Sequence, residues 1–265
     1  MLAIGKQLTT EQRLNKCVID IMGSPKYIAL AGILMIGEKR ICDKTQTAYT
    51  NGRDEVYGRA FADSLTDAEF RFLILHECYH KLYRHLVTWK HLWDENPQLA
   101  NMAMDFVINL KIADDNKDAF ATMTGALTVG CYDEKYRDMD TAQVFNALKQ
   151  DPPQGGEGGS SDAGDGSGNG TQGDASSQGF DEHDFEGAQE LSVADQQELA
   201  RWVQVVIVTC RTYSNHKSIG VRSCVTSSLP HAQAVTTQHG SDQTGVTLAW
   251  VTTYPVVSLS VLTSW

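Results

Sequence analysis

The chain has 265 residues, of which 42% are hydrophobic and 21% charged, values typical of a globular protein large enough to bury a core. Its formal net charge of −11 argues against a nucleic-acid-binding protein, because such proteins present a basic face to phosphates. The six cysteines form no CxxC pair, and Met1 to Arg13 contains no basic-then-apolar leader. We therefore expect a cytoplasmic protein with reduced thiols and with neither nucleic acid nor membrane as a partner.

The N-terminal part of the chain predicts a mixture of helices and strands. A helix is expected to begin at Thr9, where a hydroxyl side chain precedes an acidic first turn. The apolar run 27–36 could be a helix or a buried strand. Asn51-Gly52 supplies the positive φ angles of a tight turn, so segments 45–50 and 54–58 are predicted to pair as a β-hairpin.

A longer helix follows, and its start is marked by a capping box. The hydroxyl of Thr66 can accept from the amide of Glu69, whose side chain can reach back to Thr66. The apolar periodicity predicts a helix over about 67–92, and Asn96-Pro97 should end it. Further helices are predicted from 97 to about 112 and near 141–149.

The predicted helix carries His76-Glu77-Cys78-Tyr79-His80, an HExxH pentad. Two histidines four residues apart lie about 40° apart around a helix, so both imidazoles can bind one metal ion. Glu77 would then lie beside a water at the metal and could act as its general base. The alternative is a helix whose two histidines and acid merely face solvent.

A catalytic zinc site needs three protein ligands and an open position, so the pentad requires one more ligand. His85 is nine positions after His76 and lies about half a turn away while the helix continues, so it should face elsewhere. His91 is no better placed. We expect both His85 and His91 at the surface or facing a partner.

Asp105 is the best third ligand because it is a lone acid among apolar residues of the next helix. A buried carboxylate is costly unless it is paired or bound to a metal. Asn109, one helical turn further on, could support a ligand from behind. The alternative is that Asp105 pairs with Arg71, Lys111 or a backbone amide.

Composition changes after the helix predicted near 141–149. Residues 151–190 are rich in Gly, Ser and Asp and predict a flexible acidic linker. Asp165 to Asn169 resembles the DxSxS metal motif of von Willebrand A domains, although composition explains it better. Residues 191–265 predict a short helix at 192–203 and then a Val/Thr/Ser-rich tail. That tail could be β-rich, a weak membrane segment at 246–265, or the product of a reading frame that shifted upstream.

Several of these motifs occur in an order that resembles the HExxH metallopeptidases of bacteria and phages that are usually coupled to a C-terminal von Willebrand A-like domain. The likeness covers residues 10–150. The matching positions are Thr47 to Gly52, Tyr57, Phe61, Leu65-Thr66, His76 to His80, Ala103 to Asp105, and Ile108-Asn109. Beyond the linker the chain resembles neither the helical stretch nor the A-like domain of that family.

The resemblance implies a zincin-like fold in which His76, His80 and Asp105 hold Zn²⁺ and Glu77 is the base. It also implies that the strand 54–58 lines a cleft and receives an extended substrate by strand addition. Tyr49 and Tyr57 are strand aromatics first and substrate contacts second.

We therefore predict an α+β zincin-like metallopeptidase domain at 1–150, with an active-site helix and a small β-sheet, that hydrolyses peptide or protein substrates. The alternative is a catalytically idle interaction module with structural zinc. A protein partner would bind through the C-terminal module that is missing here.

Overall fold

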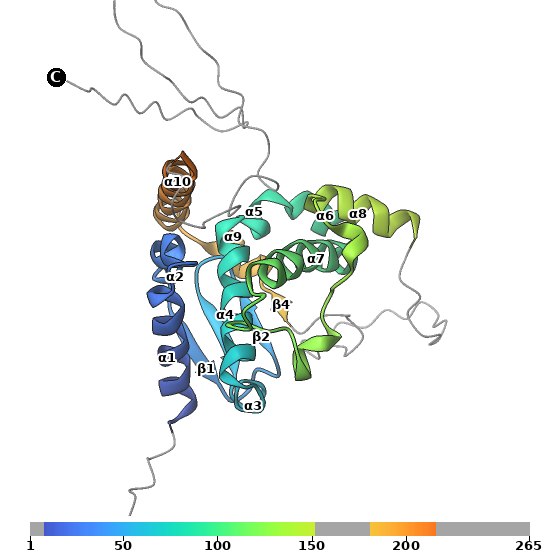
Figure 1. The fold of residues 1–265 in the computed structure, drawn as a ribbon. Coiled ribbons are helices and arrows are strands. Elements are labelled where there is room, and N and C mark those ends of the chain that lie inside the picture. Colours follow the sequence, from blue (N-terminus) through green and yellow to red (C-terminus); the bar gives the residue numbers. More distant parts are fainter. Residues whose placement is uncertain (1–7, 152–180, 216–265) are drawn as a thin grey trace, which may run out of the picture.

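A computed structural model describes residues 8–151 and 181–215, so the Asp165 to Asn169 motif and the tail after residue 215 lie outside the described residues. The described part is α+β and mostly helical, as Figure 1 shows. Its elements are α1 (Thr10–Gly23), η1 (Ile28–Leu30), α2 (Ala31–Leu34), β1 (Lys39–Cys42), β2 (Ala48–Thr50), β3 (Glu55–Gly58), α3 (Arg59–Ser64), α4 (Asp67–Leu82), α5 (His85–Thr88), α6 (Lys90–Glu95), α7 (Pro97–Asp115), η2 (Gly125–Val129), η3 (Glu134–Tyr136), α8 (Thr141–Gln150), β4 (Glu182–His183), α9 (Phe185–Glu190) and α10 (Val193–Asn215). Among these described helices, none is by itself long and apolar enough to cross a membrane; only α1 and η1–α2 taken together, bent by 118°, reach that length and apolarity.

The strands form one small mixed sheet in the order β1-β3-β2-β4. The predicted hairpin is confirmed: β2 and β3 pair antiparallel, and Gly52 has a φ of 85° in the turn. β3 also pairs in parallel with β1, so both of its edges are hydrogen-bonded within the sheet. The expectation that the strand 54–58 receives an extended substrate is therefore wrong, because strand addition needs a free edge.

Helix α4 runs through the core and carries the pentad. Its capping box is present as predicted: the Thr66 hydroxyl accepts from the Glu69 amide, and the Thr66 amide donates to Glu69 Oε2 at 2.8 Å. α4 packs against β2 on one side and α7 on another, and its residues from Phe72 to Leu82 are all buried. Close packing on several sides fixes the direction in which the pentad side chains point.

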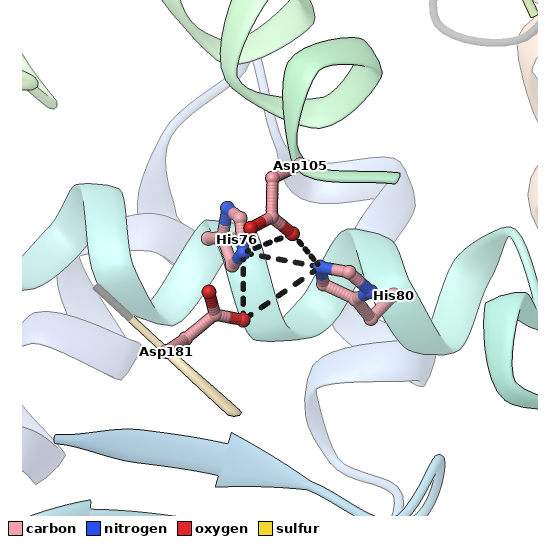
Figure 2. A group of neighbouring side chains, drawn as sticks. All are labelled: His76, His80, Asp105 and Asp181. Atoms are coloured by element: carbon pink, nitrogen blue, oxygen red, sulfur yellow. Dashed lines mark hydrogen bonds and ion pairs between the residues drawn. The ribbon is translucent and has the colours of Figure 1, made fainter. Parts of the chain in front are cut away.

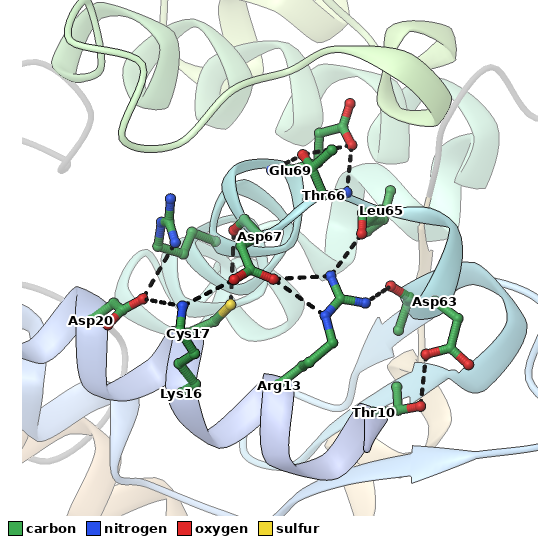
Figure 3. Close-up of polar contacts among 12 residues, drawn as sticks. Thr10, Arg13, Lys16, Cys17, Asp20, Asp63, Leu65, Thr66, Asp67 and Glu69 are labelled. Atoms are coloured by element: carbon green, nitrogen blue, oxygen red, sulfur yellow. Dashed lines mark hydrogen bonds and ion pairs between the residues drawn. The ribbon is translucent and has the colours of Figure 1, made fainter. Parts of the chain in front are cut away.

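Polar contacts hold α1 against the start of α4, as Figure 3 shows. Asp67 accepts from Arg13 at 3.1 Å and from Lys16 at 2.9 Å, and Arg13 also donates to the Leu65 carbonyl. These groups are partly exposed, so each ion pair contributes little, up to about 1 kcal/mol. Their effect is to fix the position of the α4 N-terminus.

The predicted single helix over 67–92 is wrong beyond Leu82. Arg84 has a φ of 53°, a left-handed conformation that ends the helical run, and the chain then forms α5 and α6. Neither Gly nor Pro marks this break in the sequence. The break turns His85 in a direction that a continuous helix would not allow.

The described structure also continues through residues that composition assigned to the linker. Within 181–190 the chain forms β4, which extends the sheet, and α9. The helix expected at 192–203 is α10, and it runs to Asn215. α10 contacts α2, where Gly32 leaves room for the ring of Trp202.

A Gly32→Ala substitution is expected to lower the free energy of unfolding by about 1–3 kcal/mol. A Cβ at residue 32 would lie 2.2 Å from a carbon of the Trp202 ring, so helix and ring must move apart. Gly23→Ala is the matched control, because a Cβ there meets nothing within 4 Å. Chemical denaturation measures both. A Gly32→Ala curve that coincides with wild type would contradict the α2–α10 contact.

Candidate metal centre

Four side chains from three separate parts of the fold converge on one point, as Figure 2 shows. His76 and His80 come from α4, Asp105 from α7, and Asp181 from the residue that precedes β4. One ligand atom from each lies within 4.8 Å of the others, and none of these residues is more than 2% exposed. The structure thus brings together the three predicted ligands and adds Asp181.

The four ligand atoms all lie within 4.8 Å of one another, and five of their six distances are between 3.0 and 4.0 Å. His76 Nε2 lies 3.0 Å from His80 Nε2, 3.1 Å from Asp181 Oδ2 and 3.6 Å from Asp105 Oδ1. His80 Nε2 lies 3.5 Å from Asp105 Oδ1 and 4.0 Å from Asp181 Oδ2. With zinc bonds of about 2.0–2.2 Å, tetrahedral ligand atoms are separated by roughly 3.3–3.6 Å. Two imidazole nitrogens and two carboxylate oxygens at these distances could hold a metal ion.

Asn109 orients His76 from the side opposite the cluster. Its Nδ2 donates to the Cys131 carbonyl at 2.9 Å, so its Oδ1 is the atom that faces His76 Nδ1, at 2.8 Å. The Nδ1 hydrogen of His76 then donates to Asn109, which leaves the Nε2 lone pair directed at the cluster. On α7, Asn101 donates to the second oxygen of Asp105 at 3.3 Å.

His85 is buried rather than at the surface, which corrects the expectation from helical geometry. Its Nδ1 lies 3.2 Å from His80 Nδ1. His183 of β4 also contacts His80, with its Nε2 2.7 Å from Nδ1 and 3.1 Å from Nε2. The rings of His85 and His183 therefore both contact the ring of His80. His91 is exposed, as expected.

Burial shifts the titration of the cluster residues. The pKa of Asp105 is raised well above its usual range by burial and by the neighbouring Asp181 and Glu77. Burial lowers the pKa of His80 well below its usual range, and the surrounding histidines add to this. At Asp181, burial raises the pKa, but His76 and His183 outweigh it and the net shift is downward. A divalent cation would offset the carboxylate charge buried here.

Glu77 lies beside this cluster with its charge unmatched. It is 0% exposed, and neither carboxylate oxygen has a hydrogen-bond partner among the described residues. Burial raises the pKa of Glu77 well above its usual range, and Asp181 and Glu55 add to this while Lys81 opposes it. A buried acid without a partner is costly, which points to a function rather than to stability.

Tyr57 and Tyr49, the two suggested substrate contacts, lie on the neighbouring strands β3 and β2. Tyr57 is 0% exposed, and its hydroxyl donates to Glu55. Tyr49 pairs with Glu182, and alternation along the strands puts it on the face opposite Thr50 and its partner His183. A contact of either tyrosine with substrate stays a prediction.

Sequence reasoning missed Asp181 and His183. Both residues follow directly on a Gly/Ser-rich stretch, about a hundred residues after the pentad. A composition averaged over neighbouring residues therefore predicts a linker at these positions. The signal that could have found them is the pattern Asp-Glu-His-Asp-Phe, in which two metal-ligand residue types alternate at the spacing of a strand.

Comparison with known proteins places the chain in a family. A family model with the description "Putative metallopeptidase domain" matches residues 11–217. This match extends past the domain end predicted at residue 150 and includes β4, α9 and α10. The chain has no match among curated proteins or among solved structures. The protein belongs to this family of metallopeptidase domains.

Proposed function

We propose that the protein is a zinc-dependent peptidase with a zincin-like active site. The observation that carries the proposal is the unpartnered, buried carboxylate of Glu77 beside a ligand set of two histidines and two aspartates. Of the common protein metals, zinc best suits four-coordinate sites with imidazole and carboxylate ligands. The substrate class is a peptide or protein, and the free thiols of Cys17, Cys42, Cys78 and Cys131 suit a reducing cytoplasm.

In this proposal His76, His80 and Asp105 hold the metal, and Asn109 keeps His76 in the correct tautomer. When bound, zinc supplies a lowered water pKa and polarises the scissile carbonyl. Glu77 accepts the proton of the attacking water and passes it to the leaving amine.

A second candidate is a structural zinc site in an interaction module without catalysis. The four buried protein ligands favour it, because structural zinc sites are closed whereas catalytic ones keep a position open. The unpartnered carboxylate of Glu77 favours the peptidase, because a closed structural site needs no base.

Asp105→Asn tests the metal assignment. The amide keeps the shape of the side chain but removes a charged ligand, so zinc affinity should fall by more than about tenfold. In the metal-free protein the raised pKa of Asp105 favours its neutral form, so a neutral amide in its place should not lower stability. Chelator competition measures zinc affinity, and thermal unfolding with and without zinc measures stability.

The zinc affinity of the Asp105→Asn variant decides whether Asp105 is a metal ligand. Unchanged zinc affinity in Asp105→Asn would overturn its assignment as a ligand. For wild type, cleavage of an unfolded test protein that a chelator stops and zinc restores supports the peptidase. Zinc binding without any cleavage would favour the structural site.

A further inference from the structure

β4 occupies the edge of the sheet next to the metal centre. Among the described strands it pairs with β2 alone, in parallel, through Tyr49 with Glu182 and Thr50 with His183. The Asp184 amide adds a hydrogen bond to the Thr50 carbonyl at 3.1 Å. β4 therefore covers the backbone groups of β2 that would otherwise offer an edge beside the cluster.

The side chains of this segment alternate between the metal centre and solvent. Asp181 Oδ2 lies 3.1 Å from His76 Nε2, and His183 Nε2 lies 3.1 Å from His80 Nε2. Glu182 between them is exposed. An extended segment with two metal-ligand side chains on its inner face is thus placed directly on the cluster.

The result is a centre that is closed to substrate. Asp181 would supply a fourth ligand atom to a metal held by this cluster, and Glu77 is 0% exposed. A hydrolytic site needs that corner for water and needs its base within reach of the substrate. The described state cannot therefore be the one that binds a peptide.

We propose that residues 181–184 are an internal blocking strand that lowers the activity of the centre. In the closed state Asp181 takes the fourth ligand position, and β4 takes the edge of β2 that an extended peptide substrate takes in the open state. The proposal rests on the peptidase function proposed above and adds its regulation and the place where its substrate binds.

The contacts of the segment suit release without unfolding. β4 has only two paired residues, on one edge. The anchoring apolar contacts belong to α9, where Phe185 stacks on Trp93 at 4.1 Å and packs with Leu86 and Met104. The Asp184 side chain caps α9 through the Gly187 amide. α9 can stay docked while Asp181 to His183 leave the sheet.

The test compares the zinc-loaded full chain as wild type, Asp181→Ala and Glu182→Ala. Glu182→Ala is the matched control, because it removes an exposed carboxylate from the same strand. In wild type, zinc should slow amide exchange in β4 by about tenfold, because the metal holds the strand through Asp181. Asp181→Ala should keep one zinc per chain, lose that protection and cleave an unfolded test protein roughly tenfold faster. Glu182→Ala should match wild type in all three measurements.

Two results would overturn the blocking strand: loss of zinc from Asp181→Ala, which would make Asp181 an obligatory ligand, or unchanged zinc-dependent protection of β4. Adding Glu77→Gln to Asp181→Ala should abolish the gained cleavage, which assigns it to this centre. If zinc content and exchange behave as expected but no variant cleaves, the peptidase function fails while the zinc-dependent docking of β4 stands.

Discussion

A Glu77→Gln variant is expected to lose cleavage activity by about 10²–10⁴-fold, the usual contribution of a general base. Glutamine has the same shape and cannot accept the proton of water. Because Glu77 is not among the four cluster ligands, the variant should bind zinc as wild type does. Initial rates on an unfolded test protein and zinc content by elemental analysis measure the two properties.

The stability of the same variant serves as a control for a folding defect. Glu77 is buried without a partner, so a neutral amide should leave the free energy of unfolding equal or higher. A variant that loses activity and also unfolds more easily would show that Glu77 has a structural role. Retained activity in a stable variant would remove Glu77 as the base.

The second large effect is expected at the buried ion pair beneath the pentad. Lys81 and Glu55 are both 0% exposed, and their charged atoms lie 2.5 Å apart. Lys81 also donates to the Ile36 carbonyl at 3.0 Å, and Lys39 lies 3.3 Å from Glu55. Glu55→Gln should lower the free energy of unfolding by about 3–5 kcal/mol, because it leaves the Lys81 ammonium buried without a counter-charge. Urea denaturation measures this.

The control is the double variant Glu55→Gln/Lys81→Met, which removes both charges and should recover much of the loss. A double variant as unstable as the sum of the single ones would mean that the two residues do not interact.

The pair also predicts a pH dependence. Burial raises the pKa of Glu55, but Lys81 and Lys39 outweigh it, so the folded pKa is below its usual 4.5.

The sign of this dependence follows from that lowered pKa. The stabilising contribution of Glu55 is fully present above pH 4.5 and is lost as pH falls through the lower folded value. Wild type and Glu55→Gln should therefore converge in stability as the solution is acidified. A constant difference down to low pH would contradict the ionised pair.

The sequence by itself determined the features that depend on near neighbours. The capping box at Thr66, the hairpin around Asn51-Gly52 and the two pentad histidines on one helical face all follow from interactions within a few residues. Asp105 was singled out by the cost of burying an acid, and the structure places it at the cluster, 3.5 Å from His80 Nε2. Its role as a ligand stays a prediction.

Only the tertiary structure decided which distant residues lie at the cluster. Asp181 reaches the cluster because β4 pairs with β2, a contact across more than a hundred residues that no local pattern encodes. His85 contacts His80 because Arg84 takes a left-handed conformation that ends α4. No glycine at this position predicts the break from the sequence. β3 cannot receive a substrate by strand addition, because β1 pairs along the edge that β2 leaves free. Short-range periodicity specifies which face a side chain takes, whereas packing between distant segments specifies what that face meets.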